Sequence, residues 1–263
     1  MERGMNERIR KLRKQSLETE PHIYMERAKL ETEAYMMYEG SVSVPELRAL
    51  SFKHFMEHKA LCINDGELIV GEKGDGPQAA PSFPELCCHT VEDMKVMDAR
   101  DLIYFRVSEE DLKVQEETII PFWEKRSIRH KILENMSEEW KDAYAAGIFT
   151  EFMEQRGPGH TVGSEKIYKK GFQDYKNDII EARNRLDFLN DKEAFDKKAQ
   201  LNAMEICCDA IMILGERYAA YARELAEKET DEIRKQELLQ IAANCDVVPA
   251  HAPKTFWQAI QMY

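Results

Sequence analysis

A single histidine, His160, follows a short turn made of glycine and proline. Gly157 and Gly159 permit backbone angles that other residues resist, and Pro158 between them stiffens the turn. Such a turn holds an imidazole at a fixed point with few side chains around it, where it could act as a general acid or base. Histidines after glycine turns are more often structural or exposed than catalytic. Spacing alone therefore favours the structural interpretation of His160.

A second group of reactive side chains is Cys87, Cys88 and His89, which are adjacent in the sequence. Adjacent residues rarely bind one tetrahedral ion without strain, and no second ligand pair has the spacing of a zinc site. We therefore expect no metal site in this chain.

Three carboxylates, Glu72, Asp75 and Glu85, flank a proline-rich segment. Their interpretation as ion-pair partners or helix caps is favoured over a general acid–base role, since the sequence gives no geometry to support catalysis. The glycines nearby match neither of the two common phosphate-binding patterns, GxGxxG and GxxxxGK[ST]. A phosphate loop is therefore not expected.

Composition narrows the class of protein. Of 263 residues, 33% are charged and 43% hydrophobic, which is typical of a folded, helix-rich chain, and the net charge of −12 argues against nucleic acid as the main partner. One basic run, residues 8–14, is interpreted as a solvated helix face. The sequence contains no stretch of 18 apolar residues, so no membrane span is predicted. The first residues lack the apolar core of a signal peptide, which predicts a cytoplasmic location.

The six cysteines favour reduced thiols over disulfides. Two vicinal pairs, at 87–88 and 207–208, make a poor disulfide framework, and no C-x-x-C spacing occurs. On a helix, Cys207 and Cys208 point about 100° apart, which separates the two thiols.

The elements that must position these residues are mostly helices. Apolar periodicity predicts a helix over 23–38 that Gly40 ends, and a second helix from Pro45 to about residue 58. Between residues 61–63 and 67–70, the sequence Asn-Asp-Gly predicts a β-hairpin.

Downstream, residues 71–88 are predicted to form a long loop because prolines interrupt it. Further helices are expected to start at Thr90, Ser108 and Ser137, and Pro121 should kink the second of these. Residues 164–189 are predicted to be helical again.

The clearest helix spans residues 193–228, with an apolar stripe at three- and four-residue spacing. Its members are Met204, Cys208, Ile211, Gly215, Tyr218, Ala222 and Leu225. Thr230 is expected to cap a further helix, and Thr255 a last one that stops at residue 263 without a termination signal. We therefore expect the chain to be truncated, or one piece of a split protein, with an exposed apolar patch around Phe256, Trp257, Ile260 and Tyr263.

Several segments resemble, in the same order, the N-terminal part of glycyl radical enzymes of the pyruvate formate-lyase-like family. The similarity covers essentially the whole chain, and it is most detailed with the dehydratase members around residues 149–171. The segments are residues 26–35, 63–72 with 80–85, 159–171, and 247–250 with 255–260.

The resemblance implies a fold and a reaction. The family fold is a ten-stranded β/α barrel wrapped by helices. Residues 1–263 would be the mainly α N-terminal part of a pyruvate formate-lyase-type domain, with one short β-hairpin and an incomplete barrel. The implied reaction removes water from trans-4-hydroxy-L-proline to give a pyrroline carboxylate. In that reaction His160 would face the departing hydroxyl as general acid and Phe152 would pack against the substrate ring.

The resemblance also implies partners. A radical-SAM, iron–sulfur activating enzyme would install the glycyl radical, and the full-length protein would be a homodimer acting on a small molecule, with no dissociable cofactor in this chain. The radical-carrying glycine and cysteine of the family have no match here, so we expect this chain alone to be inactive. The alternatives are another glycyl radical enzyme, of the diol dehydratase, choline lyase or formate acetyltransferase type, or a non-catalytic helical interaction module.

Overall fold

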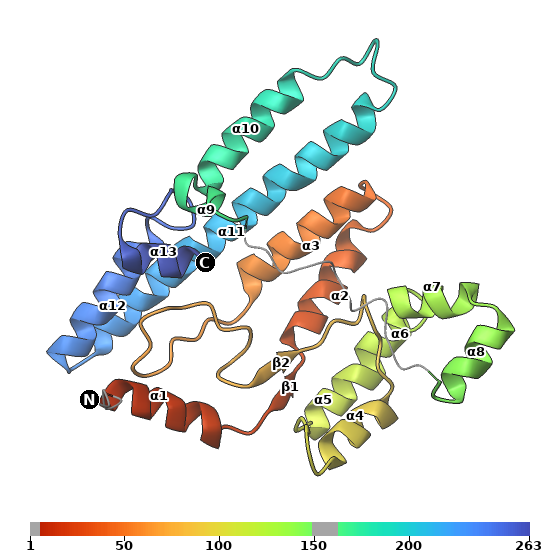
Figure 1. The fold of residues 1–263 in the computed structure, drawn as a ribbon, viewed down its shortest axis with the longest axis horizontal. Coiled ribbons are helices and arrows are strands. Elements are labelled where there is room, and N and C mark those ends of the chain that lie inside the picture. Colours follow the sequence, from red (N-terminus) through yellow and green to blue (C-terminus); the bar gives the residue numbers. More distant parts are fainter. Residues whose placement is uncertain (1–5, 149–162) are drawn as a thin grey trace. The chain divides into compact units, whose positions relative to one another are not determined.

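The computed structural model describes residues 6–148 and 163–263, and these residues form two compact units (Figure 1). Helices dominate in both units, which confirms the mainly α prediction. No helix within the described ranges is both long and apolar enough to cross a bilayer. Within those ranges, unit 1 comprises residues 6–18, 33–77 and 163–263, and unit 2 comprises residues 19–32 and 78–148.

Unit 1 is built around one long helix. This helix, α11 (Ala194–Lys228), was predicted within one residue at its start. The helices that pack against α11 are α3 (Val44–His58), α10 (Phe172–Asn184) and α12 (Glu232–Cys245) (Figure 1). Unit 1 also contains α1 (Glu7–Glu18), α9 (Lys166–Lys169) and α13 (Phe256–Met262).

The predicted apolar stripe of α11 lies in the core of unit 1. Cys208, Gly215 and Tyr218 are buried as predicted, whereas Met204 near the start of the helix is 45% exposed. A Cβ atom on Gly215 would lie only 2.6 Å from the ring of Pro249, so the chain crosses this helix at a point where no side chain fits. Small residues on α11 thus permit close packing.

The predicted capping residues Thr90 and Ser108 begin their helices, and Ser43, which the sequence analysis did not single out, begins a third in the same way. Ser43, Thr90 and Ser108 each form a capping box with an acidic residue three positions on, because their hydroxyls accept from the N3 amide. They start α3, α4 (Val91–Ala99) and α5 (Glu109–Val114). The predicted cap of α12 is wrong by one residue: Asp231, not Thr230, accepts from the first amides of that helix.

The predicted β-hairpin over residues 61–70 is wrong. Its turn forms, because the amide of Glu67 donates to the carbonyl of Asn64 at 3.2 Å, but the flanking residues form no strands. Leu61, Ile63 and Val70 pack instead against α11 and α12 in the core of unit 1. Burial of these side chains between helices outweighs pairing of two short strands with each other.

The two described strands lie elsewhere, in unit 2. Strand β1 (His22–Tyr24) pairs in parallel with β2 (Ala79–Pro81), so that Ile23 lies opposite Ala80. As a result the first predicted helix begins later, as α2 (Glu26–Tyr38), and the predicted loop 71–88 contains a short strand.

The helix predicted from Ser108 is interrupted near Pro121. A π-helical turn, η1 (Gln115–Ile119), separates α5 from α6 (Ile120–Trp123) and ends two residues before Pro121. Proline has no amide hydrogen, so a widened turn before it accommodates the ring. Unit 2 continues with α7 (Ile128–Asn135) and α8 (Glu138–Ala145).

A buried hydrogen bond holds α6 against α2 within unit 2. The indole Nε1 of Trp123 donates to Oγ1 of Thr32 at 2.8 Å, and this hydroxyl donates to the carbonyl of Ala28 at 2.6 Å. Trp123 and Thr32 are 2% and 1% exposed. The hydroxyl therefore serves as both acceptor and donor in a place without solvent.

We expect Thr32→Val to destabilise unit 2 by about 1–3 kcal/mol, because the valine keeps the shape but leaves the indole N–H buried without an acceptor. Thr32→Ser keeps the hydroxyl and should cost less than Thr32→Val. Denaturant unfolding followed by tryptophan emission measures both. A loss in Thr32→Ser that equals or exceeds the loss in Thr32→Val would show that the methyl group contributes at least as much as the hydrogen bond at this position.

Candidate functional site

The residues predicted to contact substrate, Phe152 and His160, lie outside the described residues. The described residues nearest to them in the sequence are the end of α8 in unit 2 and the residues around α9 in unit 1. Each of these two flanks is tied to its own unit by a specific set of contacts.

The flank in unit 2 is held by Arg129 on α7. Its guanidinium donates to the hydroxyl of Tyr144 on α8 at 2.8 Å and to Sγ of Cys87 at 3.4 Å. The amides of Ile128 and Arg129 donate to the carbonyls of Glu85 and Leu86, at 2.9 and 3.0 Å. Helices α7 and α8 are therefore anchored to the proline-rich segment that precedes α4.

Glu85, one of the three carboxylates considered for acid–base chemistry, is an ion-pair partner. Both terminal nitrogens of Arg27 donate to its carboxylate, at 2.7 and 3.1 Å, and Arg27 also lies 3.6 Å from Glu31. The guanidinium stacks on the ring of Phe83, 3.9 Å from its centroid. The side chains of Arg27 and Glu85 are 13% and 5% exposed, so this bidentate pair is buried and its role is structural.

The thiols near this anchor are poorly suited to chemistry. Burial raises the pKa of the Cys88 thiol to about 12, so the thiol is neutral at ordinary pH, whereas metals and electrophiles require the thiolate. All six cysteines are free thiols. Across residues 6–148 and 163–263, no group of histidine, cysteine, aspartate or glutamate side chains is placed to hold a metal ion.

The flank in unit 1 is fixed at Gly171, and this contact divides the helix predicted over 164–189 into α9 and α10. A Cβ atom on Gly171 would lie 2.2 Å from the carbonyl oxygen of Ala250 and 2.3 Å from Cα of His251. The amides of Phe172 and Gln173 donate to the carbonyls of Pro249 and Ala250, both at 3.0 Å. Two of the segments that carry the family resemblance thus meet at this junction.

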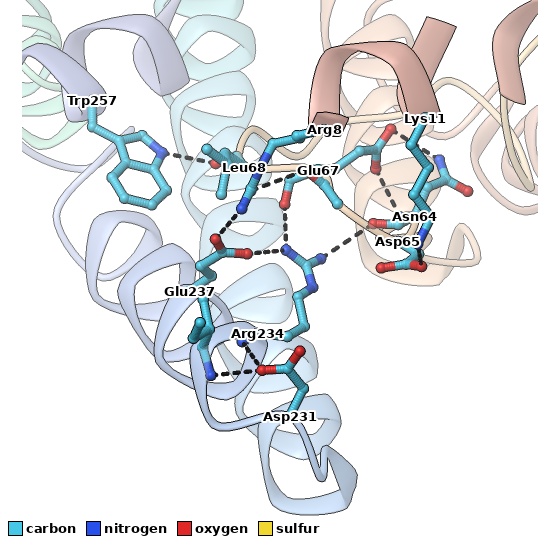
Figure 2. Close-up of polar contacts among 12 residues, drawn as sticks. Arg8, Lys11, Asn64, Asp65, Glu67, Leu68, Asp231, Arg234, Glu237 and Trp257 are labelled. Carbon is cyan, nitrogen blue, oxygen red and sulfur yellow. Dashed lines mark hydrogen bonds and ion pairs between the residues drawn. The ribbon is translucent and has the colours of Figure 1, made fainter. Parts of the chain in front are cut away.

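Residues 63–72, another segment that carries the family resemblance, form an irregular loop. Its carbonyls accept hydrogen bonds from arginines of unit 1 (Figure 2). Arg234 on α12 donates to the carbonyl of Glu67 at 2.7 Å and to that of Asn64 at 3.2 Å. Arg8 on α1 donates to the carbonyl of Gly66 at 3.2 Å, and both arginines bind the carboxylate of Glu237. Arginine suits this role because its planar fork presents several donors at once.

Helix α13 contacts the same loop a few residues further along the chain, at Leu68 and Val70. Nε1 of Trp257 donates to the carbonyl of Leu68 at 2.7 Å (Figure 2). The amide group of Gln261 pairs with both the N–H and the C=O of Val70, each at 2.9 Å. The Gln261 side chain thus forms the two hydrogen bonds that the backbone of a neighbouring strand would form with Val70. The polar backbone groups of this residue are therefore satisfied without a sheet.

The predicted apolar patch on α13 is exposed at Phe256, Ile260 and Tyr263, but the prediction is wrong for Trp257, whose indole packs against the core of unit 1. Phe256 and Tyr263 are 81% and 73% exposed, and with Ile260 and Tyr168 they line a groove of about 390 Å³. A second groove, of about 850 Å³, lies between α3, α10 and α11 and is walled mainly by apolar side chains such as Phe52. Both grooves suit packing better than polar chemistry.

Residues 5–263 match the family model of pyruvate formate lyase-like proteins, and the chain belongs to this family. The chain is 62% identical, over all 263 residues, to trans-4-hydroxy-L-proline dehydratase of Clostridioides difficile, of which it covers 33%. It is 33% identical over 245 residues to the probable dehydratase YbiW of Escherichia coli (strain K12), which is 92% of this chain and 30% of that protein.

Solved structures give the same result. The crystal structure of the Clostridioides difficile hydroxyproline dehydratase with bound substrate matches with a TM-score of 0.95, over 100% of this chain and 33% of that one. The glycerol-bound, B12-independent glycerol dehydratase from Clostridium butyricum matches with a TM-score of 0.91 at 30% identity, over 100% of this chain and 34% of that one. The chain thus spans about a third of the length of these relatives.

We expect Gly171→Ala to destabilise unit 1 by about 1–3 kcal/mol, because the new methyl group overlaps backbone atoms that cannot move aside without shifting the chain. Gly76→Ala is the matched control, since the nearest atom to its Cβ position is 4.0 Å away. Thermal unfolding of both variants tests this. A melting temperature for Gly171→Ala equal to that of Gly76→Ala would mean that the junction opens readily.

Proposed function

We propose that this chain is part of a glycyl radical dehydratase that converts trans-4-hydroxy-L-proline into a pyrroline carboxylate. The observation that carries the proposal is the 62% identity, over the whole chain, to the dehydratase of that name. Relatives whose names indicate other reactions, such as isethionate sulfite-lyase and (2S)-3-sulfopropanediol dehydratase, are only 28–31% identical. This gap in identity favours hydroxyproline as substrate over a diol or a sulfonate.

In the proposed reaction this chain supplies binding and proton transfer. A glycyl radical, installed by a radical-SAM activating enzyme, would supply a thiyl radical on the family's cysteine, the group that takes a hydrogen atom from the carbon next to the ring nitrogen and gives one back after water has left. The C4 hydroxyl is a poor leaving group as hydroxide, so His160 protonates it and it departs as water. Phe152 packs against the substrate ring and holds it beside the imidazole.

The proposal includes the setting of the whole protein. Residues 1–263 form the N-terminal part of its pyruvate formate-lyase-type domain, and the full-length protein is a cytoplasmic homodimer that meets the activating enzyme. The radical-bearing residues lie outside this sequence. A diol dehydratase is the second candidate, supported by the glycerol dehydratase structure with its TM-score of 0.91.

We expect His160→Gln in the full-length enzyme to lower the rate of dehydration by roughly 10²–10⁴-fold, the usual contribution of a general acid. Glycyl radical content should stay unchanged, because the imidazole has no part in storing the radical. Electron paramagnetic resonance and steady-state product formation measure the two quantities separately. Turnover near that of the unmodified enzyme, at equal radical content, would assign the proton to another donor.

Phe152→Ala should instead raise KM more than it lowers kcat, because the phenyl ring contributes packing to the bound substrate in both the ground state and the transition state. Steady-state kinetics on trans-4-hydroxy-L-proline, with glycerol as the comparison substrate, give the two constants. A loss confined to kcat would contradict the packing role. A preference for glycerol would favour the diol dehydratase.

A further inference from the structure

Helix α8 is the last described helix before the stretch of sequence that carries Phe152 and His160. We infer that Tyr144 and Arg129 are positioning residues of the dehydratase, an assignment that rests on the proposed function. They hold the end of α8 and so determine where Phe152 can meet the substrate ring. Neither side chain is assigned a contact with substrate, since each acts through the chain that follows α8.

The chain leaves α8 in a defined direction. Gly147 has a φ of 71°, in the left-handed region, and its amide donates to the carbonyl of Tyr144 at 3.0 Å. The amide of Ile148 donates to the carbonyl of Ala143, also at 3.0 Å. These two bonds form a Schellman motif, in which glycine adopts a conformation that other residues resist. The position of α8 therefore sets the position and direction of the backbone at Ile148.

Phe152 is close to this point along the chain. It follows Ile148 by four residues, and four residues extend at most about 14 Å. A displacement of α8 therefore moves the region that the Phe152 ring can reach. His160 follows Ile148 by twelve residues and precedes Gly163 by only three, so its position depends less on α8. Loss of the α8 attachment should consequently affect binding of the substrate ring more than proton transfer.

Arg129 binds the last turn of α8 from the neighbouring helix α7 (Figure 1). Its Nη2 donates to the hydroxyl of Tyr144 at 2.8 Å, and its guanidinium carbon lies 5.9 Å from the centroid of the tyrosine ring. Hydrogen bonds from a charged donor are stronger than those between neutral groups. No residue of α8 is fully buried, so contacts at the surface of the helix, this one among them, determine where it lies.

Arg129 is itself held in place. Its Nη1 donates to Sγ of Cys87 at 3.4 Å, and its backbone amide donates to the carbonyl of Leu86 at 3.0 Å. Ser127, which is 3% exposed, caps α7 by accepting from the amide of His130 at 3.2 Å. The guanidinium thus binds the thiol and the hydroxyl through two different nitrogens. A lysine, with one nitrogen, does not reproduce this arrangement.

The test is a double-mutant cycle in the full-length enzyme. Tyr144→Phe removes the hydroxyl and keeps the ring. It should raise KM for trans-4-hydroxy-L-proline roughly three- to tenfold, the usual worth of one hydrogen bond, while kcat and glycyl radical content change less than about twofold. In an enzyme that already carries Phe152→Ala, the same substitution should change KM less than about twofold, because the ring that it positions is absent.

Two further variants complete the experiment. Arg129→Lys should raise KM as Tyr144→Phe does, and Tyr144→Phe decides the outcome if Arg129→Lys does not fold. Lys141→Gln is the control on the same helix, because Lys141 pairs with Glu138 within α8, at 2.9 Å. It should leave KM unchanged. Circular dichroism checks the fold of each variant, and electron paramagnetic resonance measures its radical content.

Three results would overturn the assignment. One is an equal rise in KM from Tyr144→Phe with and without Phe152→Ala, since the tyrosine would then act independently of Phe152. Another is a loss confined to glycyl radical content, which would make Tyr144 a purely structural residue. The third is an unchanged KM in Tyr144→Phe although Phe152→Ala raises it, a result that leaves the proposed function intact. An unchanged KM in Phe152→Ala would instead contradict the proposed role of Phe152, and the positioning role with it.

Discussion

The 63–72 loop must have its backbone hydrogen bonds satisfied without any secondary structure, and the arrangement of unit 1 follows from that requirement. Each buried carbonyl left without a donor would cost about 1–3 kcal/mol, so a loop against the core needs donors from elsewhere. Arg234, Arg8, Trp257 and Gln261 supply them from three different helices. Because each donor has a fixed reach, these bonds set where α1, α12 and α13 lie on the loop.

The same principle operates at the start of the loop. Arg217 on α11 donates to the carbonyls of Met56 and Lys59, at 2.6 and 2.7 Å, and so ties the end of α3 to the long helix. Lys59, itself 4% exposed, donates from Nζ to the carbonyl of Glu72. Charged side chains here donate to backbone carbonyls, so both the donors and the carbonyls are hydrogen-bonded where little solvent reaches.

Local signals in the sequence were sufficient for helix starts but not for the loop. A capping box needs only residues three apart, so Thr90 and Ser108 identified their helices without reference to the rest of the chain. The Asn-Asp-Gly turn was also real, yet the strands predicted on both sides of it did not form. In place of a neighbouring strand, Arg234 donates to the carbonyl of Asn64 from 170 residues away. Sequence periodicity contains no information about so distant a partner.

The break at Gly171 has the same origin. Its cause is the backbone at Ala250, and only the folded chain shows that the two approach too closely for a side chain. The roles of Phe152 and His160 could be inferred from resemblance alone, and they stay predictions.

The segments that carry the family resemblance are points of contact. Residues 63–72 accept hydrogen bonds from arginines of unit 1, Glu85 binds Arg27, and Gly171 lies against the backbone of Ala250. Such positions tolerate few replacements, because a lost donor or an added methyl group costs more than most surface changes. The family was identified from these segments, whereas the proposed chemistry rests on only two side chains, Phe152 and His160. Similarity over the whole chain thus identifies the family, and kinetics on Phe152 and His160 are needed to assign the reaction.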